Sequence, residues 1–215
     1  MIEQVLQKIA EHTQSGPVVV EAAHIYADKK PGLEQQKGAQ IAAQLCEGLN
    51  VPSIRMLLID DFNVTTRSLD TNEYLSWLSD QGYIPDEIVM ESELVPAAMR
   101  LLQELKDTVP AKKLVVPKYD PWQRSRALGL WTRVGKVPLL TTGGRPSCAL
   151  LDASFYLQKS QKGLVSLTVL PQEYSPQQAA TMAILERVNK PVPVVNLYFQ
   201  PNNGHVSIES QNNNI

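Results

Sequence analysis

The sequence predicts an α/β protein, namely a single three-layer domain over residues 1–200 with a mostly parallel, Rossmann-like sheet of about six or seven strands. Short aliphatic runs of strand length alternate with amphipathic segments of helical length along most of the chain. Strands that alternate with helices are joined by crossovers, which makes neighbouring strands parallel. Most connecting segments are short, which disfavours two independent domains.

Hydrophobic periodicity predicts the elements in order. Residues 2–14 carry Ile2, Val5, Leu6 and Ile9 on one helical stripe. Six more helices are expected at 33–49, 71–82, 93–107, 121–133, 147–160 and 176–189. Strands are expected at 18–22, 54–59, 87–90, 114–116, 137–140, 164–170 and 192–199. The turn signal Asn203-Gly204 predicts a hairpin over 192–208, so residues 201–215 form its end and a flexible tail.

The composition is that of an ordinary globular protein, with 43% hydrophobic and 20% charged residues. The formal net charge of −2 excludes a uniformly basic protein. It also conceals two charged stretches. Residues 57–107 hold eleven acids against three bases, a formal −8, and residues 112–136 hold seven bases against one acid, a formal +6.

Nothing in the chain indicates a membrane or an oxidising compartment. The N-terminus lacks the apolar core of a signal peptide, and no stretch approaches the roughly 20 apolar residues that span a bilayer. Cys46 and Cys148 form no paired motif of the kind that binds zinc. We therefore expect a cytoplasmic protein with no membrane partner, no zinc site and no disulfide scaffold.

Ligands of an open parallel sheet bind at the carboxyl ends of the strands, which directs attention to the loops there. The first loop contains His24, a candidate general acid or base because its pKa lies near neutrality, and Lys30, a candidate anion ligand. The alternative is that His24 satisfies backbone groups at the strand end.

The second loop begins with Asp60 and Asp61, directly after a predicted buried strand. Carboxylates at this position bind a metal ion or hydrogen-bond hydroxyl groups, so both are catalytic candidates. Neighbouring side chains of an extended chain point apart, so one of the two is expected to face the site. The alternative is an Asx turn or a helix cap.

The third loop follows the predicted strand 137–140 and leads into a helix. Its glycines permit a close approach of the backbone to a ligand, and its hydroxyl groups, guanidinium and helix amides favour phosphate or carboxylate. The candidate ligand-binding residues are Thr141, Thr142, Gly143, Gly144, Arg145 and Ser147. The alternative is a turn in which Ser147 caps the helix.

The basic stretch 112–136 also holds Tyr119, Trp122 and Trp131. Basic side chains among aromatic ones suit phosphate pairing and base stacking. The alternative is a solvated helix whose tryptophans pack inward.

The first half of the chain resembles the nucleotide-binding half of class I aminoacyl-tRNA synthetases and their relatives, over about residues 17–107. The likeness consists of a strand that ends near His24, the pair Lys30-Pro31, a helix containing residues 37–42, and a strand that runs into Ile59-Asp60-Asp61. The family carries an ATP-binding motif of the HIGH type, but here residues 33–36 contain no histidine, and the lysine-rich second signature is absent. The resemblance therefore implies a Rossmann-like fold and transfers no catalytic residue.

Three functions follow from these observations. The first is binding of a nucleotide or other phosphorylated small ligand at the edge of the parallel sheet, by a small enzyme or a domain derived from one, with a divalent metal accompanying a nucleotide. The second is a non-catalytic protein that binds RNA or an acidic partner through residues 112–136. The third is a phosphosugar-binding or transferase domain, because one fold hosts many functions.

Overall fold

The computed structural model describes residues 6–7, 9, 17–22, 25–26, 32–62, 71–115, 127–188, 192–200 and 206–211. The chain divides into two compact units. The first unit comprises residues 1–92, 159–174 and 193–215, and the second comprises residues 93–158 and 175–192. Each unit is described by itself below. That residues 1–200 form a single domain stays a prediction.

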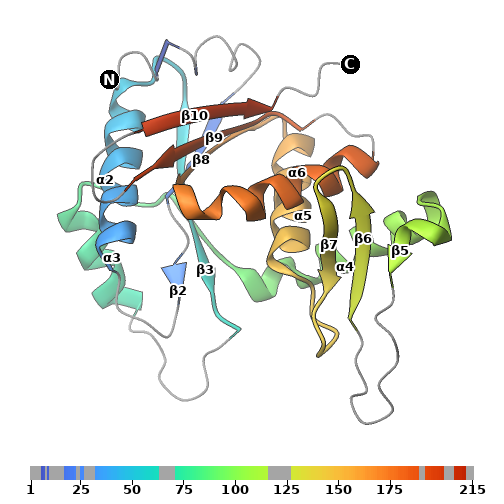
Figure 1. The fold of residues 1–215 in the computed structure, drawn as a ribbon. Coiled ribbons are helices and arrows are strands. Elements are labelled where there is room, and N and C mark those ends of the chain that lie inside the picture. The colour runs from blue at the N-terminus through green and yellow to red at the C-terminus, as the bar shows by residue number, and fades with distance from the viewer. Residues whose placement is uncertain are drawn as a thin grey trace. The chain divides into compact units, whose positions relative to one another are not determined.

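The first unit is built on the larger sheet (Figure 1). Its strands are β1 (Val18–Glu21), β2 (Ile25–Tyr26), β3 (Ser53–Asp60), β4 (Glu87–Met90), β8 (Val165–Pro171), β9 (Val194–Phe199) and β10 (Val206–Gln211). They follow the order β10-β9-β8-β1-β3, and both β2 and β4 pair with β3. Met56 pairs with Glu21 of β1 and with Glu87 of β4, so β1 and β4 flank β3 on opposite sides.

The pairings within this sheet are parallel except that of β9 with β10. The expected α/β class and mostly parallel sheet are therefore confirmed, as is the terminal hairpin. Read across the sheet, β4-β3-β1-β8-β9 is the order of a doubly wound Rossmann sheet.

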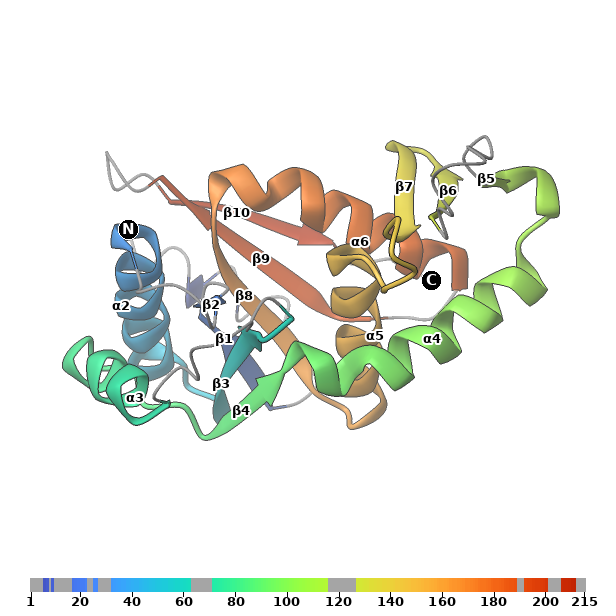
Figure 2. The same ribbon diagram turned by 90° about the horizontal axis from the view of Figure 1, so that it is seen from below.

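One face of the sheet packs against α2 (Leu33–Gly48) and α3 (Thr71–Asp80), as Figure 2 shows. Alternate strand residues supply this core, including Val18 and Val20 of β1 and Leu167 of β8, because successive side chains point to opposite faces. The buried positions of α2 are mostly small residues such as Gly38, Ala39 and Ala42. Small side chains let the helix backbone approach the sheet closely, and α2 lies over β1 and β8.

The second unit contains most of α4 (Glu91–Thr108) and α5 (Cys148–Gln161), all of α6 (Ser175–Val188), and a small antiparallel sheet. The strands of this sheet are β5 (Leu114–Val115), β6 (Leu128–Thr132) and β7 (Gly135–Leu140), preceded by the short helix η1 (Ala111–Lys113). The short helix η2 (Gln172–Tyr174) belongs to the first unit.

Two expectations about this segment are wrong. The helix predicted over 121–133 is strand β6 over residues 128–132, and residues 121–126 lie outside the described part. The predicted strand 137–140 belongs to the antiparallel sheet and not to the parallel one. The physical reason is a tight turn at Gly135, which has φ 99° and reverses the chain into a hairpin instead of a crossover.

None of the helices in the described part of the chain is long and apolar enough to cross a membrane.

Candidate ligand site at the carboxyl edge of the parallel sheet

The strand order places a topological switch between β1 and β8. From β1 the chain continues to β3 and β4 on one side, and β8 and β9 lie on the other side. Ligands of open α/β sheets bind outside the carboxyl ends of the strands at such a switch. The described residues at this edge are Glu21, the last residue of β1, and Ala22 after it, Asp60, the last residue of β3, and η2 after β8.

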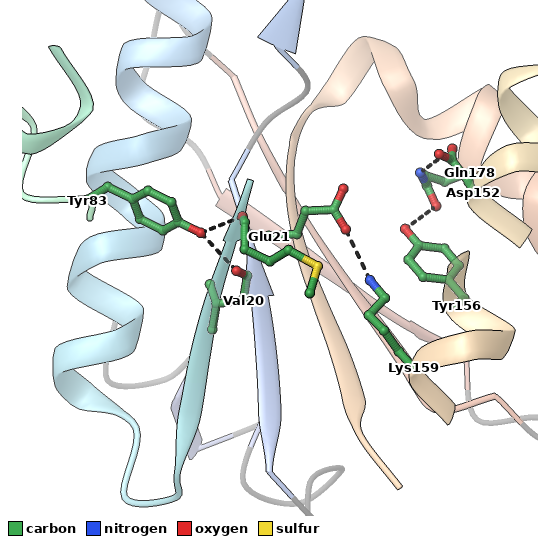
Figure 3. Close-up of polar contacts among 8 residues, drawn as sticks. Val20, Glu21, Tyr83, Asp152, Tyr156, Lys159 and Gln178 are labelled. Atoms are coloured by element: carbon green, nitrogen blue, oxygen red, sulfur yellow. Dashed lines mark hydrogen bonds and ion pairs between the residues drawn. The ribbon is translucent and has the colours of Figure 1, made fainter. Parts of the chain in front are cut away.

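A row of polar residues crosses the sheet at the end of β1. Glu21 is the register partner of Thr168 in β8, and Thr168 is the partner of Asn196 in β9. These three residues are at most 5% exposed, and they occupy the face opposite the α2 core. The carboxylate of Glu21 forms a buried ion pair with Lys159, with 3.2 Å between Oε2 and Nζ (Figure 3).

Two buried polar atoms next to this row lack a protein partner among the described residues, namely Ser166 Oγ and Asn196 Oδ1. Buried polar atoms are normally hydrogen-bonded, since an unsatisfied one costs about 1–3 kcal/mol. The sheet face below the switch thus carries a charged pair and unused hydrogen-bonding capacity.

Tyr83 fixes the two strands that lead to this edge. Its buried hydroxyl lies 2.9 Å from the carbonyl oxygen of Val20 in β1 and 2.7 Å from that of Met56 in β3, and it donates to these oxygens (Figure 3). Burial raises the pKa of the Tyr83 phenol, so the donor stays protonated at physiological pH. The spacing of β1 and β3 is therefore held from the helix side.

Two carboxylates meet at the entrance to the switch. Glu34 lies in the first turn of α2, and Glu173 lies in η2 directly after β8. Partial desolvation, followed by the negative charge of Glu173, raises the pKa of the Glu34 carboxyl.

The two aspartates of the second loop have different environments. The half-buried Asp60 ends β3, and its Oδ1 accepts the backbone N–H of Phe62 at 3.0 Å in an Asx turn. Its Oδ2 accepts no hydrogen bond from the described residues. Asp61 instead uses both oxygens on Ser92, accepting the backbone N–H at 2.9 Å and the hydroxyl, so it caps the first turn of α4. The two neighbouring acids thus have different partners, and among the described residues only Asp60 keeps a carboxylate oxygen without a hydrogen bond.

The 141–147 loop lies in the second unit and follows β7 of the antiparallel sheet, so the expectation that it follows a strand of the parallel sheet is wrong. Three hydrogen bonds within the loop stabilise the turn. The Thr141 N–H donates to Arg145 O at 2.8 Å, the Gly144 N–H donates to Thr141 O at 2.9 Å, and the Arg145 N–H donates to Thr141 Oγ1 at 3.2 Å. Gly144 has φ 80°, a conformation that glycine adopts at little cost.

Ser147 caps α5, because its Oγ accepts the N–H of Leu150 at 3.2 Å and donates to Pro138 O at 2.6 Å. These contacts match the alternative interpretation of a turn with a capping serine. Thr142, Gly143 and Arg145 remain on the surface of the loop, and an anion-binding role for this loop stays a prediction.

His24 and Lys30 lie outside the described residues, as do Lys118, Tyr119, Trp122, Arg124 and Arg126 of the basic stretch. Within the described part of that stretch, Arg133 is paired with Glu186 at 2.6 Å, and Trp131 is 49% exposed. The expectation that Trp131 packs inward is therefore wrong.

Sequence reasoning missed the buried partners Glu21 and Lys159. The available signal was a charged residue in an apolar setting, namely Glu21 after three valines and Lys159 in the helix that begins at Cys148. The two residues are 138 positions apart in the sequence, so no local pattern indicates their pairing. The described residues contain no group of three or more His, Cys, Asp or Glu side chains that could hold a metal ion.

No protein-family model matches the chain, and no curated protein matches it. Several solved structures are similar to the chain. Arginyl-tRNA synthetase from Plasmodium falciparum superposes with a TM-score of 0.61 at 15% identity, over 87% of this chain and 43% of that one. A glutamate tRNA ligase from Elizabethkingia meningosepticum gives 0.59 at 14% identity, over 85% and 49%. Glutamate-tRNA synthetase from Elizabethkingia anophelis gives 0.57 at 14% identity, over 86% and 50%.

The chain thus spans half or less of the length of these three synthetases. At such identities the likeness concerns the fold. It confirms the resemblance to the Rossmann-like part of class I aminoacyl-tRNA synthetases that the sequence indicated.

Proposed function

We propose that this protein binds a nucleotide or another phosphorylated small ligand at the carboxyl edge of the parallel sheet, between β1 and β8. The observation that carries the proposal is Asp60, which ends the strand next to β1 with one carboxylate oxygen unused by the described residues. In doubly wound sheets, an acid at the end of this strand hydrogen-bonds ribose hydroxyls. The synthetase-like fold supports a nucleotide among the phosphorylated ligands.

The two acids at the entrance, Glu34 and Glu173, complement this role. Their mutual repulsion is relieved by a divalent cation, and Mg²⁺ is commonly held by one or two carboxylates together with substrate phosphates. A divalent ion bound between these two carboxylates would also neutralise phosphate charge at the site. We assign His24 the acid–base role and Lys30 an anion contact in the same loop.

Thr142, Gly143 and Arg145 form a separate proposed contact for phosphate, supported by the exposed glycine turn and guanidinium. An assay for chemical turnover of the bound ligand decides whether the protein is an enzyme. A phosphosugar would use the same edge without needing a base-binding surface.

Thermal-shift measurements with nucleotides and sugar phosphates, each with and without Mg²⁺, test the proposal, because a ligand that binds the folded state raises the midpoint by mass action. We expect a nucleotide with Mg²⁺ to give the largest shift and Asp60→Asn to abolish it. Asp80→Asn, an exposed acid at the end of α3, is the matched control and should leave it unchanged.

Arg145→Ala separates the loop from the edge. A loss of ligand affinity in this variant alone would move the site to the 141–147 loop. A shift that survives Asp60→Asn, or no shift with any phosphorylated ligand, would contradict the proposed edge site.

A further inference from the structure

The outer face of the β6–β7 hairpin carries an aromatic ring beside a lysine. Trp131 in β6 and Lys136 in β7 are register partners. Their neighbours Leu130 and Val137, also partners, are buried, so alternation along the strands places Trp131 and Lys136 on the opposite face. Trp131 is 49% exposed and Lys136 is exposed. A large ring left half in solvent on a short hairpin suits it to contact a partner.

Gly129 has no side chain, and this leaves room for the side chain of Lys136. A Cβ atom at this position would lie 2.9 Å from Lys136 Cε and 3.4 Å from Lys136 Cγ. The aliphatic stem of Lys136 therefore lies across β6 at the glycine, two residues from Trp131. None of the carboxylates in the described part of the chain pairs with Lys136, whereas the nearby Arg133 is held by Glu186 at 2.6 Å.

A second lysine lies in the segment on the other side of β6. Helix η1 lies against β6 and ends at Lys113. The next residue, Leu114, is the register partner of Leu130, the residue before Trp131. Lysines are therefore present in both segments that flank β6 near Trp131, and the stretch 112–136 as a whole carries a formal charge of +6.

We propose that this face, defined by Trp131, Lys136 and Lys113, binds single-stranded nucleic acid. A base stacks on the indole, and the flanking lysines neutralise the phosphates on either side, which is the combination that single-strand binding surfaces use. Positive charge alone would suit any polyanion. The exposed ring between the charges is the feature that selects an unpaired base.

Fluorescence anisotropy of the full-length chain with labelled oligo-U and oligo-dT of about 12 nucleotides tests the proposal. Salt is varied from about 50 to about 200 mM, because the dependence of the binding constant on salt counts the phosphates that are neutralised. Similar affinity for both oligomers indicates recognition of base and phosphate alone, and preference for oligo-U adds contacts to the 2′-hydroxyl. Both results support single-strand binding.

The variants separate stacking from charge. Trp131→Leu keeps an apolar strand residue and is expected to weaken binding about five- to a hundredfold without changing the salt slope, while Trp131→Phe keeps a ring and most of the affinity. Lys136→Gln is expected to reduce the slope by about 0.7. Lys162→Gln, an exposed lysine of the first unit, is the matched control and leaves affinity and slope unchanged.

Polyglutamate of matched charge is the competitor that represents an acidic protein partner. Equal competition by polyglutamate, together with unchanged affinity of Trp131→Leu, would overturn the proposal in favour of simple charge attraction. An absence of binding to either oligomer at low salt would overturn it outright. Asp60→Asn is expected to bind the oligomers normally, so failure of the proposed ligand site and failure of this surface are distinguishable.

Discussion

Removing one partner of the Glu21–Lys159 ion pair is predicted to destabilise the protein severely. The side chains of Glu21 and Lys159 are only 7% and 3% exposed, so substitution of one removes a close opposite charge from a buried ionised group. Breaking a buried pair in this way typically costs about 3–5 kcal/mol. That is a large part of the roughly 5–15 kcal/mol by which domains are stable. We therefore expect Lys159→Met and Glu21→Leu each to lower the urea midpoint strongly.

The double variant distinguishes two causes of the lost stability, namely the loss of the attraction and the cost of burying one charge without this partner. Replacing both partners by apolar residues removes the attraction and both desolvation penalties, which is often neutral or stabilising. Glu21→Leu with Lys159→Met should therefore recover most of the stability that each single variant loses. Urea unfolding followed by circular dichroism gives the three free energies of a double-mutant cycle.

In thermal unfolding, a loss of this size corresponds to a fall of roughly 6–20 °C in Tm for a chain of this length. Single variants that lose less than about 1 kcal/mol would refute the reasoning, because that is the value of a solvated surface pair. Strictly additive losses in the double variant would refute it as well.

Three further predictions concern single residues. Tyr83→Phe removes the donor that bridges β1 and β3 and should cost about 1–3 kcal/mol in urea unfolding; a loss below measurement error would show that the hydroxyl is dispensable. Asp61→Ala removes the cap of α4 and should lower the free energy of unfolding by about 1 kcal/mol. The ligand affinity of the folded protein should stay unchanged, and a specific loss of affinity would show that Asp61 contacts the ligand. Because the pKa of Glu34 is raised above its ordinary 4.5, the folded state holds a proton that the unfolded chain releases, and stability falls as pH rises through the folded pKa. Glu34→Gln should flatten that decline in urea midpoints measured against pH, and an unchanged profile would assign the decline to other groups.

The sequence was sufficient for the parts of the fold that local pattern determines. Alternation of apolar strands and amphipathic helices indicated the parallel sheet, and the turn at Asn203-Gly204 indicated the terminal hairpin, which pairs Phe199 with Val206. It failed at 128–132, because five residues fit a helical or an extended pattern equally, and the pairing with β7 decides between them.

The candidate site was only partly predictable from the sequence, because it too depends on pairing between segments that are far apart in the chain. Asp60 was found because strand ends are visible in sequence, and its difference from Asp61 depends on the distant Ser92. The polar row of Glu21, Thr168 and Asn196 requires the register of three strands that are far apart in the chain. No local pattern contains that information.

A phosphorylated ligand is expected to bind where β1 and β8 part, and amide chemical-shift mapping during titration with a nucleotide and Mg²⁺ locates its binding site. We expect the largest perturbations in residues 32–36, 60–62 and 172–174, at the start of α2, the end of β3 and the helix η2. Perturbations confined to residues 141–147, or none at ligand concentrations that raise Tm, would contradict it.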